Sequence, residues 1–346
     1  MGTHRQGRHL TSGNTWLFAR YYTRIYWTIW YARKVIQMPI EPTEAIWMNG
    51  EMVPWQEAKV HVLTHALHYG SGVFEGIRAY RTERGVAVFR LADHIERLLA
   101  SAKILMMDAP FTHSQLVDAT KELIRVNRLD DGCYIRPIMF LGYGEMGLNT
   151  IPCKTDVAIA AWPWGTYLGE EGMMKGIRMK VSSWQRHSPN AIPTAAKNTG
   201  MYVNSSLAKL EALKAGYDEA IVLAPDGRVS ECTGENIFAV KRGRIVTPQV
   251  SQAGALSGIT MDSIEVIASD LGYTVTHEPL IRTDFYLAEE AFLTGTAAEV
   301  VPVVEVDDRV VGSGQPGPIT REIQSTYLAA ARGELDRYKD WLDYVD

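Results

Sequence analysis

The chain has 346 residues, of which 46% are hydrophobic and 22% are charged. These fractions are typical of globular proteins, and they exclude a chain that is disordered throughout. The length predicts about two domains. The formal net charge of −5 argues against general nucleic-acid binding. The three scattered cysteines form no CxxC pair and no zinc spacing, which favours reduced thiols in a cytoplasmic protein.

Residues 1–40 differ in composition from the rest of the chain. They contain no Asp or Glu, but they carry six basic residues and eight aromatic residues. Three interpretations stay open: a targeting peptide, an amphipathic segment at a membrane surface, or a translated upstream stretch before a natural start at Met38. We favour the last, a segment without function or without fixed structure. Arginines interrupt the apolar run, so we expect no membrane-spanning helix.

Alternating and helical spacings predict a small α+β domain over residues 41–166. Asn49-Gly50, between two apolar runs, is a typical hairpin turn. Thr112 and Gln115 form a capping-box pattern at the start of a helix. The predicted elements are strands over residues 86–89, 134–141 and 155–161 and helices over residues 91–104 and 112–126.

A break in this pattern predicts a linker, because residues 162–165 and 169–172 are rich in Trp, Pro and Gly. A larger domain is expected over residues 167–346. Its strands and helices do not alternate in regular β-α-β order, which favours an α+β fold over a doubly wound sheet. The predicted elements are strands over residues 179–183, 220–223 and 237–240 and helices over residues 201–215 and 261–271, each helix followed by a glycine.

Two patterns suggest other functions. Residues 142–147 match GxGxxG after a strand, but Pro152 follows where a dinucleotide-binding motif requires a helix, so we interpret them as a mobile glycine loop. His61, His65 and His68 have helical spacing that could hold a metal, but they lack the glutamate of the HExxH pattern. We therefore prefer packed or hydrogen-bonded histidines to a metal site.

Four segments carry groups that could share one site. Small and turn-forming residues over 188–197 end in a lone lysine, which can have a lowered pKa and form a Schiff base, although most lysines are solvated. Residues 230–236 bring two acids, or form only a solvated hairpin. Residues 256–260 lead into a helix whose amides and threonine can bind phosphate, unless the threonine is simply an N-cap. Residues 294–299 offer a second set of amides. Together, these groups match the requirements of pyridoxal phosphate.

From about Ala45 to the C-terminus, the sequence resembles the branched-chain amino acid aminotransferases, a class-IV, fold-type IV family of pyridoxal-phosphate enzymes. The matching blocks, in the family's order, are residues 59–70, 73–78, 134–137, 192–197, 234–236 and 295–299. The resemblance implies a two-domain α+β fold like that of D-amino acid aminotransferases, with a smaller N-terminal and a larger C-terminal domain. It also implies pyridoxal 5′-phosphate as cofactor, and amino transfer between L-leucine, L-isoleucine or L-valine and 2-oxoglutarate.

The resemblance also assigns roles to individual residues. It makes Lys197 the Schiff-base lysine and general base, places Glu231 at the pyridine nitrogen, and places Tyr202 at the phenolic oxygen of the ring. The implied phosphate ligands are Arg97, Ile259, Thr260 and Thr296. The implied site for the substrate α-carboxylate is Tyr134 with the amides of Thr296 and Ala297. The implied side-chain pocket is lined by Tyr69, Phe74, Arg136, Trp164 and Tyr167.

Some positions depart from the family pattern. Ser257 stands where the family usually has proline, Asn-Thr-Gly-Met follows Lys197, and Cys232-Thr233 replaces a smaller pair. These changes leave the chemical groups in place. The rival readings are a D-amino acid aminotransferase, an aminodeoxychorismate lyase, or an interaction protein led by residues 1–40 with an idle enzyme fold. Residues 134–137 argue against the two enzymes. The resemblance further implies a homodimer at least, with a hexamer built of dimers as a larger assembly, and no metal.

Overall fold

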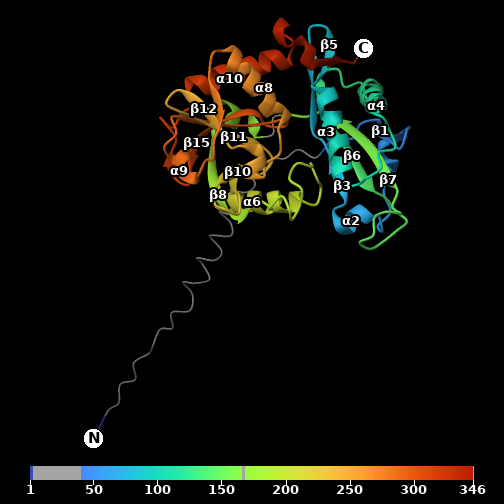
Figure 1. The fold of residues 1–346 in the computed structure, drawn as a ribbon, viewed down its shortest axis with the longest axis horizontal. Helices are drawn as coiled ribbons and strands as arrows, with labels where there is room; N and C mark the ends of the chain where they lie inside the picture. The colour runs from blue at the N-terminus through green and yellow to red at the C-terminus, as the bar shows by residue number, and fades with distance from the viewer. Residues whose placement is uncertain (3–39, 166–167, 346) are drawn as a thin grey trace. The chain divides into compact units, whose positions relative to one another are not determined.

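The computed structural model describes residues 1–2, 40–165 and 168–345. The chain divides into two units, Met1–Glu41 and Pro42–Asp346. The helices and strands of the described residues all belong to the second unit (Figure 1). The three interpretations of residues 1–40 concern positions that lie, apart from Met1, Gly2 and Ile40, outside the described residues.

The first of two sheets is built almost entirely from the first half of the chain. Its strands follow the order β17-β5-β4-β6-β7-β1-β2, with β3 paired to β6, and every pairing is antiparallel. The strands are β1 (Ala45–Met48), β2 (Glu51–Pro54), β3 (Gly72–Phe74), β4 (Ile77–Thr82), β5 (Gly85–Phe89), β6 (Gly132–Leu141), β7 (Thr155–Trp162) and β17 (Leu342–Tyr344). The accompanying helices are η1 (Trp55–Glu57), α2 (His65–Tyr69), α3 (Leu91–Ile104) and α4 (His113–Val126).

The second sheet is mixed. Its order is β10-β9-β8-β15-β14-β11-β12-β13, with β16 paired to β15, and β8 lies parallel to both of its neighbours. The strands are β8 (Ile177–Gln185), β9 (Glu219–Leu223), β10 (Val229–Cys232), β11 (Asn236–Lys241), β12 (Arg244–Thr247), β13 (Val275–His277), β14 (Glu290–Gly295), β15 (Glu299–Val306) and β16 (Arg309–Val310). The helices are α5 (Gly169–Lys175), α6 (Tyr202–Lys214), α7 (Val250–Ala253), α8 (Ile259–Asp270), α9 (Arg282–Tyr286), α10 (Pro318–Ala331) and η2 (Asp336–Trp341).

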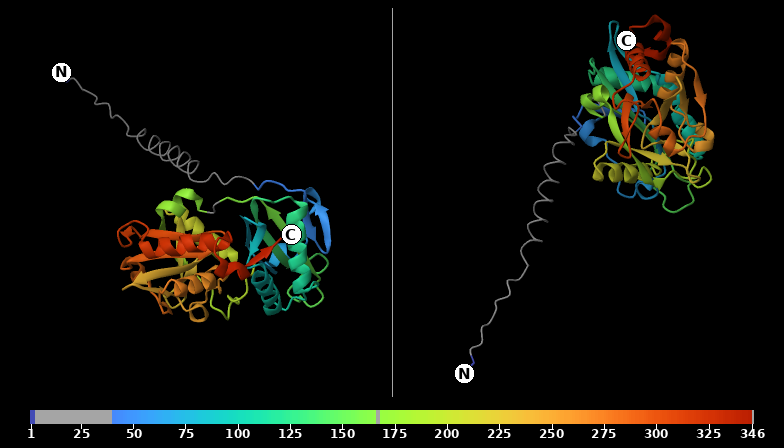
Figure 2. Two further views of the ribbon diagram at one scale, coloured as in Figure 1. Left: turned by 90° about the horizontal axis from the view of Figure 1, so that it is seen from above. Right: turned by 90° about the vertical axis from the view of Figure 1, so that its left-hand side faces the viewer.

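One hydrophobic cluster joins the two sheets. It contains Phe89 of the first sheet and Phe238 and Phe292 of the second, whose rings stack at 4.9 Å, together with apolar residues of α8 and α10. The C-terminal strand β17 pairs with β5, so the C-terminal end lies among the strands of the first sheet (Figure 2). The shared cluster thus connects the two sheets, and the chain returns from the second sheet to the first through β17.

The predicted secondary structure is confirmed in most elements. The helix α3 has the predicted bounds, and α4 begins after Thr112 with the predicted capping box to Gln115. Asn49 and Gly50 form the hairpin turn between β1 and β2, both with positive φ. The two-sheet architecture is the predicted α+β class. None of the helices in the described ranges is long and apolar enough to cross a membrane.

The prediction of a linker over residues 169–172 was wrong. Residues 169–172 open the helix α5, which runs from Gly169 to Lys175 and packs against β15. Two acidic residues in its first turn interact favourably with the helix dipole, and Lys175 pairs with Glu171 one turn earlier. The strands before residue 166 all belong to the first sheet, and those after residue 167 belong to the second sheet except β17. The domain boundary between residues 166 and 167 stays a prediction.

Candidate active site

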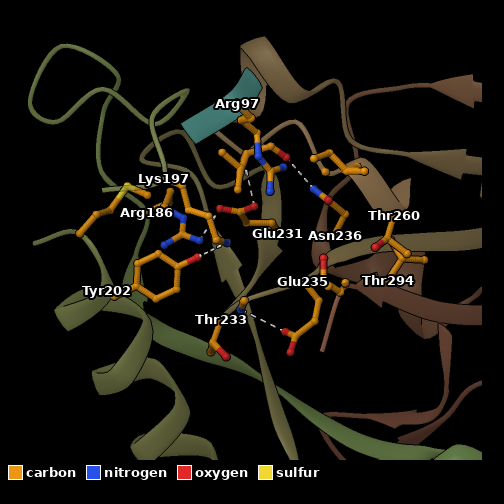
Figure 3. A pocket seen from close by; sticks show the side chains of 17 residues that line it. Arg97, Arg186, Lys197, Tyr202, Glu231, Thr233, Glu235, Asn236, Thr260 and Thr294 are labelled. Carbon is orange, nitrogen blue, oxygen red and sulfur yellow. Dashed lines mark hydrogen bonds and ion pairs between the residues drawn. The ribbon is translucent and has the colours of Figure 1, made fainter. Parts of the chain in front are cut away.

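A polar cavity lies where α3, the loop before α6, the β10–β11 turn, the start of α8 and the β14–β15 turn meet (Figure 3). All seven residues predicted to hold the cofactor line it. The residues around the cavity are Arg97, Arg186, Lys197, Met201, Tyr202, Glu231, Thr233, Gly234, Glu235, Asn236, Leu256, Gly258, Ile259, Thr260, Thr294, Gly295 and Thr296.

Lys197 is held from both sides. Its backbone N–H donates to the Ser101 hydroxyl on α3 at 3.1 Å, and its carbonyl accepts from the Phe74 amide at the end of β3 at 3.0 Å. Its Nζ donates to the hydroxyl of Tyr202, the first residue of α6, at 2.7 Å. The lysine amine therefore has a fixed backbone and one oriented partner, which suits a group that must attack a bound carbonyl carbon.

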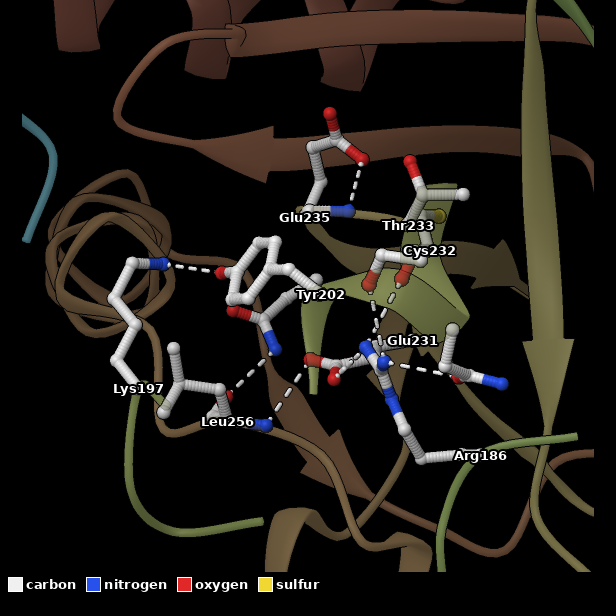
Figure 4. Close-up of polar contacts among 12 residues, drawn as sticks. Arg186, Lys197, Tyr202, Glu231, Cys232, Thr233, Glu235 and Leu256 are labelled. Atoms are coloured by element: carbon white, nitrogen blue, oxygen red, sulfur yellow. Dashed lines mark hydrogen bonds and ion pairs between the residues drawn. The ribbon is translucent and has the colours of Figure 1, made fainter. Parts of the chain in front are cut away.

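Glu231 lies on β10 and is buried (Figure 4). One carboxylate oxygen forms an ion pair with Arg186, and the other accepts the Leu256 amide at 3.0 Å. Both oxygens of this buried carboxylate thus have donors, as a buried charge requires.

The N-terminus of α8 forms another part of the cavity wall, where Ile259 and Thr260 are the first residues of the helix. Gly258 is the N-cap residue, and no side chain caps the helix, so the alternative that Thr260 is the N-cap was wrong. A side chain at Gly258 would place its Cβ 2.0 Å from the Asn236 Oδ1, which explains a glycine there. The nearby Thr294 hydroxyl is buried without a partner in the described part of the chain. Uncapped amides and a hydroxyl without a partner make an anion site.

Arg97 reaches this part of the cavity from α3. Its guanidinium donates to Glu75 at 2.6 and 2.8 Å and to the Ser257 carbonyl at 2.7 Å. His94, one turn earlier, contacts the same carboxylate at 2.8 Å. Burial by itself raises the pKa of Glu75, but the charge of Arg97 and the hydrogen bonds from His94 and Arg97 bring it well below its ordinary value. Glu75 therefore stays ionised and fixes Arg97 in place.

Aromatic side chains continue from Lys197 toward the first sheet. The ring of Phe74 lies 4.8 Å from that of Tyr202, and the Arg136 guanidinium lies 4.8 Å from the Phe74 centroid. Arg136 donates to the Tyr134 hydroxyl at 2.8 Å, and the Trp164 ring lies 5.0 Å from Tyr134. Four residues predicted to bind the substrate thus form one contact cluster: Phe74, Tyr134, Arg136 and Trp164.

Three predicted residues stand apart. Tyr69 is 45% exposed and lines a separate cavity of about 410 Å³ with Asn198 and Gly200. Ala297 is half-buried in the β14–β15 turn next to Thr296, but it is not part of the cavity wall. Tyr167 lies outside the described residues.

The structure adds two residues to which the sequence assigned no role. Arg186 had no signal of its own, whereas Glu235 lies inside the acidic segment already singled out. Burial and the nearby Glu219 raise the pKa of Glu235 to about 8. Glu219 also pairs with Lys209 at 2.6 Å. A second carboxyl group at this cavity therefore holds its proton near neutral pH.

The two patterns set aside in the sequence have structural explanations. His65 contacts the Ser71 hydroxyl at 2.6 Å and the Gly147 carbonyl at 2.8 Å. His68 contacts the Val62 carbonyl at 2.9 Å. The residues directly after 147 form bends and turns rather than a helix, and the next element is the strand β7. The interpretation as hydrogen-bonded histidines and a glycine loop is consistent with these contacts.

Comparison with known proteins agrees with this geometry. Residues 72–306 match the family described as Amino-transferase class IV. The chain is 46% identical over 300 residues to a branched-chain-amino-acid aminotransferase of Pseudomonas aeruginosa, covering 87% of this chain and 97% of that one. It is 47% identical over 310 residues to the Escherichia coli K12 enzyme of that name, covering 89% and 100%.

Solved structures of such enzymes have the same fold. The crystal structure of the Escherichia coli branched-chain amino acid aminotransferase matches with a TM-score of 0.85 at 47% identity, covering 88% of this chain and all of that one. A branched-chain amino acid aminotransferase of T.th. with pyridoxamine 5′-phosphate matches with a TM-score of 0.86 at 48% identity, covering 89% and 100%. The chain belongs to the class-IV aminotransferases, which use pyridoxal phosphate. Within that family it groups with the branched-chain-amino-acid aminotransferases.

The donor set of the cavity fits this cofactor. It offers an amine at Lys197, a buried carboxylate at Glu231, and the amides at the start of α8 beside Arg97 and the unpartnered Thr294 hydroxyl. These are the partners that an aldehyde, a pyridine nitrogen and a phosphate need.

Proposed function

We propose that this chain catalyses reversible transfer of the amino group between L-leucine, L-isoleucine or L-valine and 2-oxoglutarate, giving branched-chain 2-oxo acids and L-glutamate. The supporting observation is the cavity in which Lys197 donates to Tyr202 at 2.7 Å, beside the Glu231 carboxylate and the uncapped start of α8. The names of the similar enzymes supply the substrate class.

Lys197 is the proposed catalytic residue. Its amine holds pyridoxal phosphate between reactions, and once released it removes the proton from the substrate Cα. Bound pyridoxal phosphate supplies an electron sink for the electron pair left at Cα. Tyr202 orients the Lys197 amine and would hydrogen-bond the phenolic oxygen of the bound cofactor. Glu231 would hold the pyridine nitrogen and keep it protonated.

The phosphate of the cofactor is assigned to the positive end of the cavity. The free amides at the start of α8 favour an anion there. Arg97 adds a full positive charge, and its two hydrogen bonds to Glu75 fix the orientation of its guanidinium. The proposed phosphate ligands are Arg97, Ile259, Thr260 and Thr296.

The substrate is assigned to the aromatic cluster that continues from the cavity, which begins where Phe74 contacts Tyr202. The Tyr134 hydroxyl and the amides of Thr296 and Ala297 would bind its α-carboxylate. The walls would hold an apolar side chain, and Arg136, beside Tyr134, would bind the γ-carboxylate of glutamate through charge-assisted hydrogen bonds. The proposed pocket residues are Tyr69, Phe74, Arg136, Trp164 and Tyr167.

The proposal includes the setting in which the enzyme works. Tyr69 lies on a separate cavity within one chain, so its pocket role requires a second copy of the chain, and we propose a homodimer at least and a hexamer of dimers as a larger assembly. The small domain over residues 41–166 and the large domain over 167–346 belong to the same proposal. The three unpaired cysteines support a cytoplasmic setting.

The test is the reaction itself. Purified enzyme given L-leucine and 2-oxoglutarate should produce the leucine-derived 2-oxo acid and glutamate in equal amounts. Lys197→Ala should lose turnover, whereas Lys175→Ala, at an exposed lysine of α5, should keep it. Activity on D-alanine but not L-leucine would overturn the substrate assignment, and turnover by Lys197→Ala would overturn the catalytic one.

A further inference from the structure

Arg186 is a buried cation that none of the proposed roles uses. It follows the end of β8 and is 4% exposed. Its backbone N–H donates to the Leu223 carbonyl at 2.8 Å, so its position is fixed by the adjacent strand β9. Burying a guanidinium is costly unless it is fully paired, so a cation in this position needs an explanation.

The guanidinium connects two elements of the cavity (Figure 4). On one side, Nη2 forms the ion pair with Glu231 and contacts the Cys232 carbonyl at 3.4 Å. On the other side, Nη1 donates to the Ser205 hydroxyl at 3.2 Å and approaches the Asn204 amide oxygen at 3.4 Å. Both of these residues lie on α6, the helix that begins with the residue paired to the catalytic lysine.

We propose that Arg186 is a positioning residue that keeps Glu231 ionised and aimed at the pyridine nitrogen, so that the ring nitrogen holds its proton during transamination. This inference rests on the proposed placement of Glu231 at that nitrogen. A neutral glutamic acid would compete for the same proton, and the ring would then be a weaker electron sink.

The surroundings of Glu231 leave Arg186 as its principal counter-charge. The Leu256 amide supplies a second donor at 3.0 Å, but it carries no net charge. Among the described residues, the charged and titratable groups that interact with Glu231 include Arg97, already paired to Glu75, the Cys232 thiol and Glu235, and Lys197 and Tyr202 line the same cavity. Glu235, whose pKa is raised to about 8, holds its proton near neutral pH and supplies no counter-charge. Without the guanidinium, Glu231 would be a buried carboxylate whose only remaining donor is an uncharged amide, and an unpaired buried charge is costly.

A purely structural role is the competing explanation, because the same guanidinium also braces α6. Four variants separate the two. Arg186→Gln removes the charge but keeps an amide donor, and Arg186→Lys keeps the charge. Ser205→Ala removes the shorter of the two contacts with α6 and leaves the ion pair with Glu231. Arg178→Met removes an ion pair with Glu305 at the start of β8, the strand that Arg186 follows.

The experiment uses each protein loaded with pyridoxal phosphate that carries ¹⁵N in its ring. The ¹⁵N chemical shift reports whether the ring nitrogen is protonated, and it is recorded from pH 6 to 9 alongside kcat and KM for L-leucine. In Arg186→Gln, we expect the shift to move toward that of the unprotonated ring. We also expect kcat to fall about 10²-fold with KM nearly unchanged, as when one preorganised charge partner is removed.

The other variants should keep the protonated signal of the natural enzyme, including Arg186→Lys. A protonated ring in the folded glutamine variant overturns the inference. Loss of the ring proton in Ser205→Ala overturns it as well, because that variant retains the ion pair. If Arg186→Gln does not fold, the lysine variant decides: an unprotonated ring there refutes the role of charge.

The natural enzyme separates this inference from the proposed function. If it binds pyridoxal phosphate and transaminates L-leucine with an unprotonated ring nitrogen, the role of Arg186 is refuted and the proposed function stands. If it neither binds pyridoxal phosphate nor turns over L-leucine, the proposed function itself fails.

Discussion

Replacing Glu235 with glutamine should stabilise the protein at alkaline pH. Glu235 is buried beside the cavity, and burial together with the charge of Glu219 raises its pKa from 4.5 to about 8. Its Oε2 accepts the Gly234 amide at 3.0 Å, a contact that the glutamine carbonyl oxygen can also make. The substitution therefore removes the titration with little change in packing.

Proton binding to Glu235 determines whether the stability of the folded protein rises or falls with pH. Between pH 4.5 and about 8, the folded state holds the Glu235 proton and the unfolded state has lost it. The proton on Glu235 therefore contributes its full stabilisation below the pKa of the unfolded state, 4.5. This stabilisation is lost as the pH rises through the pKa of the folded state, about 8. At 1.36 kcal/mol per pKa unit, the full penalty is of the order of 5 kcal/mol. At ~2 °C per kcal/mol, that is roughly 10 °C in Tm.

The assay is thermal unfolding from pH 5 to 9, with the cofactor bound and after its removal. The Tm of the natural protein should fall relative to that of Glu235→Gln as the pH rises. The control is Glu171→Gln, at a glutamate whose side chain is 79% exposed, which should follow the natural protein at every pH. A constant Tm difference between natural protein and Glu235→Gln across this range would refute the pKa assignment.

Three further predictions concern single contacts. Gly258→Ala places a Cβ 2.0 Å from the Asn236 Oδ1, so pyridoxal-phosphate affinity measured by fluorescence titration should fall at least about tenfold, and an unchanged Kd would count against the phosphate site. Thr112→Ala removes the capping box of α4 and should lower the unfolding free energy by about 1 kcal/mol without changing kcat; a change in kcat with no loss of stability would contradict this. Tyr202→Phe removes the 2.7 Å hydrogen bond to Lys197, so kcat should fall and its pH profile should shift; an identical profile would show that the tyrosine does not orient the amine.

Local patterns were enough to predict most helices and strands, but they could not predict which way some side chains point. Arg97 falls outside the apolar spacing of its helix, which by itself predicts a solvent-exposed residue. It turns inward because Glu75, in the connection between β3 and β4, accepts two of its hydrogen bonds. A pairing across 22 residues leaves no periodic signal, so only the family resemblance indicated a ligand there.

Two other outcomes have the same kind of cause. The glycines around residues 169–172 suggested a break, but the acidic first turn of α5 and its packing against β15 outweigh that local preference. Arg186 was missed entirely because its function depends on Glu231, which lies 45 residues later in the chain. The lysine and the two acids were found in the sequence because each sits in a segment of unusual composition.

The pairing of β17 with β5 has a consequence for how the protein is made. The first sheet consists of strands from the first half of the chain, but β5 gains its outer neighbour only from residues 342–344. The Val345 amide adds a bond to the Val86 carbonyl at 3.0 Å, and Arg84 lies 4.0 Å from the Tyr344 ring centroid. While the polypeptide is still being synthesised, β5 is an unpaired edge that can pair with other chains. Removing these last residues should therefore promote aggregation of newly made protein, even though they lie far from Lys197 in sequence.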